Sequence, residues 1–152
     1  MIGLAQLGIA IGALGVVLTF IGLFPSVIGF ANPVAGVGIV QFSAILSGFT
    51  VLIFGALLYV KFSFYVGRAA NLSQQIGIRL ALTGLVLAGM VGLADVLGFG
   101  SHPRGEGSDV FFGSLQAAGT LGGFFMASIG VMIYALTGQP PADDEEREIS
   151  TN

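Results

Sequence analysis

Four polar residues within or beside long apolar stretches are the candidates for chemistry in this chain: Asp95, Gln41, Gln116 and Ser26. Asp95 is the only acidic residue inside a stretch that is apolar enough to cross a membrane. An ionisable residue in such a place is by default a candidate for function, because a charge away from water is costly. With the two glutamine amides, Asp95 could form an outward-facing site for a cation or a proton. The alternative is a solvated residue at a helix end.

The two glutamines also have two interpretations. Gln41 and Gln116 each lie near the start of an apolar stretch, on the side of the expected helix that carries most of its glycines. The amides could line a polar site near an axis that relates the two halves of the chain. They could equally form a hydrogen bond between helices, worth about 0.6–2 kcal/mol, and we favour this structural role.

We predict no enzyme activity, no cofactor and no metal. The chain has no cysteine and one histidine, so thiol chemistry and a disulfide framework are excluded. His102, Glu106 and Asp109 share a glycine-rich loop, which is more typical of a solvated connection than of a metal site. No basic patch is present that would bind nucleic acid.

The composition indicates that membrane helices position these residues. Only 9% of the 152 residues are charged and 55% are hydrophobic, whereas a soluble domain has about 25% charged residues. Four apolar stretches, at about 4–24, 39–59, 76–97 and 110–136, match the roughly 20 residues that span a bilayer. The first stretch has no basic residue before it, so we expect a retained span rather than a signal peptide. We predict an all-α integral membrane protein with a four-helix transmembrane bundle.

The basic residues predict the orientation in the cell membrane. Lys61, Arg68 and Arg79 flank a central linker at residues 61–75 that has no acidic residue. Short loops rich in Lys and Arg stay in the cytoplasm, so we expect the linker and both termini to be cytoplasmic. Arg79 lies within the third stretch, and its side chain is expected to extend to the lipid headgroups.

The chain is predicted to be a duplication of one helical hairpin. At an offset of 69 the matched pairs include Gln6 and Gln75, Gly8 and Gly77, Gly15 and Gly84. At an offset of 75 they include Gly38 and Gly113, Gln41 and Gln116, Gly48-Phe49 and Gly123-Phe124, Gly55 and Gly130, Tyr59 and Tyr134. Ser26 takes the position of Asp95 in the first copy. The repeats, 4–60 and 75–137, should be parallel and related by an axis near the membrane normal. They form a membrane domain at 1–137, followed by an acidic, disordered tail at 138–152.

Glycine spacing predicts which faces of the helices touch. One stripe comprises Gly8, Gly15, Gly22 and Gly29, and its counterpart comprises Gly77, Gly84 and Gly98. Two further sets of residues recur at alternating spacings of three and four, which is a heptad seam. They are Gly38, Gln41, Ile45, Gly48, Leu52, Gly55 and Tyr59, and Gly113, Gln116, Thr120, Gly123, Ala127, Gly130 and Tyr134. Small residues let helix backbones approach closely in lipid. We predict a close-packed, left-handed bundle with these glycines inside.

Two resemblances bear on function. The duplicated glycine-rich hairpins resemble those of rotary ATPase proteolipids, whose ion site needs a carboxylate in the middle of an even-numbered helix. The second and fourth stretches contain no acidic residue, so we reject that function. One lysine against four arginines, with an acidic segment at 143–148, resembles the composition of small four-span membrane proteins of salt-loving archaea.

Two functions therefore remain. The favoured one is a structural or accessory membrane subunit, whose partners are the lipid bilayer and either a second copy of the chain or a larger membrane complex. The alternative is a small transporter or channel with an outward-facing polar site around Asp95, Gln41 and Gln116.

Overall fold

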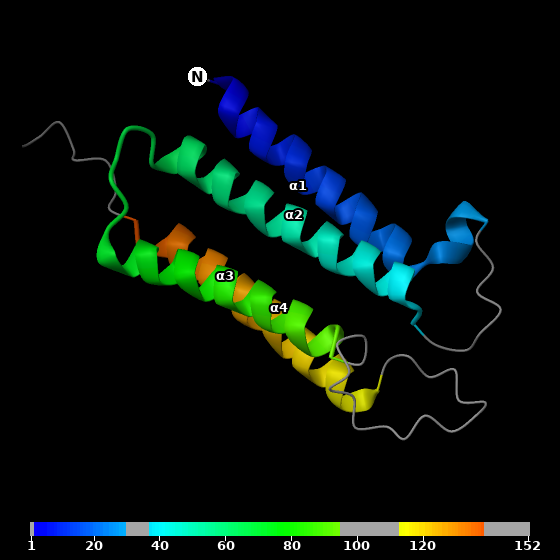
Figure 1. Ribbon diagram of the computed structural model, residues 1–152. Helices are drawn as coiled ribbons and strands as arrows, with labels where there is room; N and C mark the ends of the chain where they lie inside the picture. The colour runs from blue at the N-terminus through cyan, green and yellow to red at the C-terminus, as the bar shows by residue number, and fades with distance from the viewer. Residues whose placement is uncertain (1, 30–36, 95–112, 139–152) are drawn as a thin grey trace, which may run out of the picture.

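The computed structural model describes residues 2–29, 37–94 and 113–138. These residues form four long helices, α1 (Ile2–Leu23), α2 (Ile39–Phe64), α3 (Leu72–Gly92) and α4 (Ser114–Leu136), and a short 3₁₀ turn, η1 (Pro25–Ile28) (Figure 1). No strand occurs in these three ranges. All four helices are long and apolar enough to cross a membrane. For the part of the chain that the structure describes, the predictions of an all-helical fold and of four apolar helices are confirmed.

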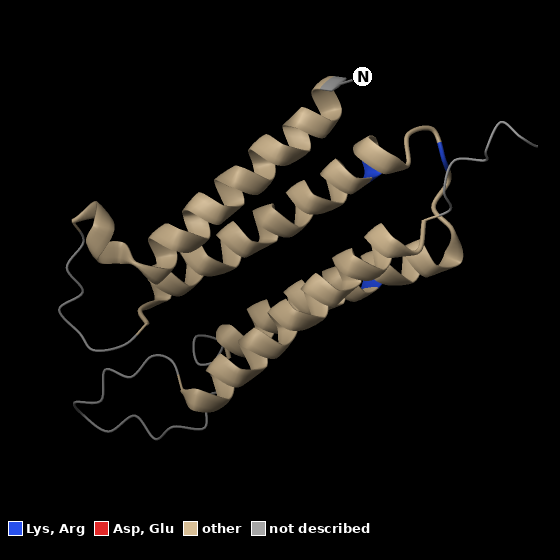
Figure 2. Ribbon diagram, turned by 180° about the vertical axis from the view of Figure 1, so that it is seen from behind, with Lys and Arg blue, Asp and Glu red and all other residues tan. Residues whose placement is uncertain are grey.

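The helices are arranged as two antiparallel hairpins. Within each hairpin the two helices run in opposite directions: α1 packs along α2, and α3 packs along α4. Far fewer contacts join the two hairpins, and these are mainly between α2 and the helices α3 and α4. In both views α2 lies between α1 and the second hairpin (Figures 1 and 2). The start of α1, the α2–α3 connection and the end of α4 all lie at one end of the molecule (Figure 1). The starts of α2 and α4 lie at the other end.

The connection between α2 and α3 is shorter than the linker predicted at residues 61–75. α2 continues to Phe64, and α3 begins at Leu72. Asn71 caps α3: its side chain accepts a hydrogen bond from the backbone N–H of Gln74 at 2.7 Å, and the Gln74 side chain accepts one from the Asn71 N–H at 3.2 Å. This reciprocal capping box starts a helix. The polar residues that follow Asn71 therefore belong to α3, and the linker prediction was wrong there.

The glycine stripe predicted for the first helix stops earlier than expected. α1 ends at Leu23, because Pro25 has no N–H to donate and its ring clashes with the preceding turn. Gly29 instead closes η1 with a φ of 79°, a left-handed conformation that glycine adopts without strain. Gly38 is the residue that precedes α2, and a Cβ added to it would have no neighbouring atom within 4 Å. The predictions that Gly29 belongs to the stripe and that Gly38 belongs to the seam were therefore wrong. Gly98 lies outside the described residues.

Several glycines inside each hairpin touch the backbone of the partner helix. A Cβ added to Gly8 would lie 2.6 Å from the backbone N of Tyr59, and one added to Gly22 would lie 2.8 Å from that of Ile45. In the second hairpin, a Cβ on Gly77 would lie 2.8 Å from the backbone N of Tyr134. Distances this short cannot be relieved by rotating a side chain. Any larger residue would therefore push the two helices apart.

Large side chains fill the space between the hairpins. Phe42 of α2, only 1% exposed, lies against Gly92 of α3. The rings of Phe49 in α2 and Phe124 in α4 have centroids 4.2 Å apart. Near this pair, a buried cluster joins three helices: Ile53, Ala81, Leu85 and Ala127. The hairpins are thus joined by interlocking side chains rather than by direct backbone contact.

Candidate functional site

Three of the four predicted polar residues lie within the described ranges, so the predicted site around Asp95 stays a prediction. Asp95 lies outside the described residues, as do His102, Glu106 and Asp109. Ser26 is in η1 with its side chain exposed. Gln41 and Gln116 are both at the third position of their helices, α2 and α4. The starts of these two helices lie at the same end of the molecule (Figure 1).

Gln116 caps the start of α4. Its side-chain Oε1 accepts a hydrogen bond of 2.7 Å from the backbone N–H of Gly113, the residue before the helix. Both residues are buried. The first N–H groups of a helix have no partner within it, so this bond satisfies a donor that would otherwise be buried alone. This bond lies within the start of α4, so it is not the hydrogen bond between helices that we predicted for Gln116.

Gln41 has the same place in α2. It is half-buried and stands three residues after Gly38, which precedes α2 as Gly113 precedes α4. Gln74 stands three residues after Asn71 in the capping box of α3. A glutamine three residues after a helix cap is a known sequence signature of a helix start. The spacing of Gln41 and Gln116 from the glycines before them was therefore a sign of a helix start, although we assigned both residues to the seam.

Hydroxyl groups within the helices bond to backbone carbonyls. Thr19, Thr50 and Ser128 donate to the carbonyls four residues earlier, at 2.8, 2.7 and 2.9 Å. Thr120 donates from α4 to the carbonyl of Ala88 in α3, at 3.4 Å. In the described ranges every buried side-chain nitrogen and oxygen has a hydrogen-bond partner. Three of these hydroxyl groups therefore bond within their own helix, and Thr120 bonds to the neighbouring helix.

A set of side-chain hydrogen bonds that we did not predict from the sequence lies at the end of the molecule opposite to Gln41 and Gln116. Three side chains from the α2–α3 connection and the start of α3 donate to the last carbonyls of α4, and we call them the α4 clamp: Tyr65, Asn71 and Gln74. Tyr65 donates to Ala135 at 2.6 Å, Asn71 to Thr137 at 2.6 Å and Gln74 to Tyr134 at 3.3 Å.

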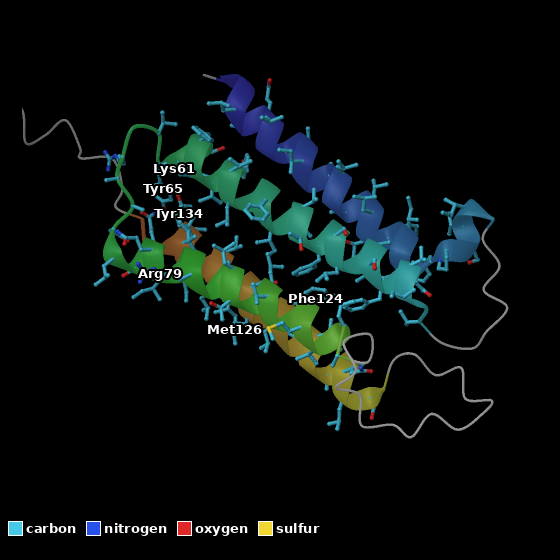
Figure 3. All side chains as sticks on the ribbon, viewed as in Figure 1. Lys61, Tyr65, Arg79, Phe124, Met126 and Tyr134 are labelled. Carbon is cyan, nitrogen blue, oxygen red and sulfur yellow. The ribbon has the colours of Figure 1, made fainter. Side chains whose placement is uncertain are left out.

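The α4 clamp satisfies carbonyls that the helix itself cannot. The last four carbonyls of a helix have no intrahelical partner, and α4 ends at Leu136. The ring of Tyr65 also meets the ring of Tyr134 edge-on, with centroids 6.1 Å apart and planes at 81° (Figure 3). Tyr65 is only 9% exposed and Tyr134 only 3%. Tyr65 therefore links the end of α4 to the end of α2, whereas Asn71 and Gln74 link it to the start of α3.

The three basic residues of the described ranges gather toward the clamp end of the molecule (Figure 2). The Lys61 ammonium donates a hydrogen bond to the carbonyl oxygen of Arg68. Arg79 is exposed, eight residues into α3, on the outside of the second hairpin (Figure 3). The opposite end has no basic residue within the described ranges.

Comparison with known proteins adds no family to these observations: no family model, no curated protein and no solved structure matches the chain significantly.

Proposed function

We propose that this chain is a multi-pass integral membrane protein with a structural or accessory role, without enzyme activity. This role is supported by the hydrogen bonds that polar side chains in the helices form with backbone groups. Thr120 joins α4 to α3 through the carbonyl of Ala88, and Gln116 caps its own helix. A transport path needs polar groups that are free to replace the hydration of a solute, and these are already bonded.

The surface of the four helices supports a lipid environment. Large apolar side chains are exposed on each of them, for example Val17 (52%), Val40 (80%), Val86 (61%) and Phe125 (70%). Soluble proteins rarely expose apolar patches beyond a few hundred Å². The shortest of the four, α3, has 21 residues and is about 31 Å long at 1.5 Å per residue. That length matches a hydrocarbon core of about 30 Å.

Corresponding contacts in the two hairpins support the proposed duplication. Gly8 meets Tyr59 in the first hairpin, and Gly77 meets Tyr134 in the second. Gly15 meets Leu52, and Gly84 meets Ala127 at the equivalent place. Each second pair follows from the first by the offsets of 69 and 75. Two copies of one glycine-packed hairpin, parallel to each other, would produce this pattern.

The orientation that we propose follows from the charged end of the molecule. Lys61, Arg68 and Arg79 lie toward the end with the α2–α3 connection, and the positive-inside rule assigns such a connection to the cytoplasm. The start of α1 and the end of α4 lie at the same end (Figure 1). Both termini would then be cytoplasmic, in the cell membrane.

Reconstitution tests the structural role against the transporter alternative. Liposomes containing the purified chain should show no more ion or solute leakage than protein-free liposomes. The chain extracted from its own membrane in mild detergent should form a particle larger than one copy, either a homo-oligomer or a larger complex. A flux that is lost in Asp95→Asn would contradict the structural role and establish the transporter.

A further inference from the structure

Arg79 is a cation on the outside of an apolar helix. It is the eighth residue of α3, so its Cα lies roughly 10 Å along the axis from the helix start. Its side chain is exposed. Residues 2–29, 37–94 and 113–138 contain no aspartate or glutamate that could pair with it. In a bilayer, a guanidinium that starts from this depth is stabilised by an anionic group near the interface.

The neighbours of Arg79 on α3 form a lipid-facing stripe. Leu72 (73% exposed) and Ile76 (51%) precede it by seven and three residues, and Val86 (61%) follows it by seven. Residues at these spacings share one face of a helix. Side chains in a helix lean toward its N-terminus, so the guanidinium extends along Ile76 toward the level of Leu72, where α3 begins.

The other two basic residues are in different surroundings. Lys61 donates to the carbonyl of Arg68, and Arg68 itself is half-buried in the connection between α2 and α3. Among the basic residues of the described ranges, Arg79 alone combines a guanidinium with an apolar stripe that continues deeper along the same helix. That combination matches the two parts of a phospholipid, an anionic head and an acyl chain.

We propose that Arg79 binds the phosphate of an anionic phospholipid in the leaflet next to the α2–α3 connection. The planar guanidinium donates two parallel hydrogen bonds to phosphate oxygens, and the acyl chains lie along the stripe that includes Val86. This inference rests on the proposed membrane location. A lipid fits better than the acidic tail, because acyl chains can cover the apolar stripe beside the guanidinium, whereas residues 143–148 are all charged.

The test is lipid retention after purification from an equal mixture of phosphatidylglycerol and phosphatidylcholine, measured by native mass spectrometry. The intact chain should retain phosphatidylglycerol preferentially. Arg79→Gln should lower that preference about fivefold, as expected for one basic residue at a lipid surface, and Arg79→Lys should restore part of it. Arg68→Gln, which removes an equal charge from the connection, is the matched control and should change little.

Three results would overturn the lipid site. Equal loss in Arg79→Gln and Arg68→Gln would indicate a diffuse effect of net charge. Displacement of the lipid by inorganic phosphate would indicate a site for the free anion. A preference that appears only after residues 143–148 are deleted would identify the acidic tail as the counter-charge. Failure of the intact chain to remain in membranes after carbonate washing would instead contradict the proposed membrane location.

Discussion

Phe49 of α2 and Phe124 of α4 lie ring against ring, with centroids 4.2 Å apart and planes inclined by 30°. The two residues are separated by 75 positions, the same offset that aligns the second helices of the proposed repeats. Under the proposed duplication, each ring would contact its own counterpart. Equivalent residues that contact each other lie close to a two-fold axis. An axis that relates the two proposed repeats would therefore pass near this pair of rings.

The aromatic pair should couple the hairpins energetically. In a double-mutant cycle, Phe49→Leu and Phe124→Leu should show a coupling of about 0.5–1.5 kcal/mol, the range for aromatic pairs. The measurement is the free energy of unfolding in mixed detergent micelles. The control cycle pairs Phe49→Leu with Phe125→Leu, because Phe125 is 70% exposed. Equal coupling in both cycles would contradict a specific contact.

Adjacent glycines in α4 should respond in opposite directions to the same substitution. A Cβ on Gly123 would lie 2.6 Å from the backbone N of Ala88 and 2.6 Å from the carbonyl oxygen of Gly84, whereas one on Gly122 would meet nothing within 4 Å. We expect Gly123→Ala to destabilise the chain by about 1–3 kcal/mol through overpacking. Gly122→Ala should stabilise it by up to about 1 kcal/mol, the difference in helix propensity. Thermal unfolding of the two variants in one detergent makes the comparison, and similar shifts would disprove close contact at Gly123.

The capping role of Gln116 predicts that its amide oxygen stabilises the folded chain. Gln116→Ala leaves the buried N–H of Gly113 without its acceptor, which costs about 1–3 kcal/mol. Gln116→Glu keeps an oxygen at that position, and an anion is favourable at the start of a helix. It should therefore be close to the parent chain in unfolding measurements. If Gln116→Glu were as unstable as Gln116→Ala, the cap would not be the role of this residue.

Removing one hydroxyl should weaken the α4 clamp. Tyr65→Phe deletes the donor to Ala135 but keeps the ring against Tyr134, so the expected cost is about 0.5–1.5 kcal/mol. Tyr59→Phe is the matched control, because Tyr59 is 37% exposed and its contact with Phe64 is between rings. Hydrogen exchange of the last turn of α4 provides a local readout. Faster exchange is expected in Tyr65→Phe alone, and unchanged exchange there would argue against the clamp.

Hydropathy and composition were enough to predict the four helices, because each is a long apolar run between polar or Gly- and Pro-containing segments. The start of α3 was misplaced because Asn71 and Gln74 are polar and resemble a linker, although their side chains bond to each other's backbone. Gln116 was assigned to the seam because it is a polar residue at the seam spacing, and its role in capping α4 is visible only in its hydrogen bond to Gly113. The bond from Tyr65 to Ala135 joins residues 70 positions apart. Such a contact depends on how the hairpins dock, and no local pattern encodes it.

Labelling of single cysteines in intact cells tests the proposed membrane topology most directly. The chain has no cysteine of its own, so each reaction reports one position. Ser26, in η1, and Ala69, between α2 and α3, are both exposed and lie on opposite sides of the proposed membrane. A membrane-impermeant maleimide should label Ser26→Cys in intact cells and Ala69→Cys only after permeabilisation. Labelling of Ala69→Cys in intact cells, or of both positions from the same side, would contradict the topology.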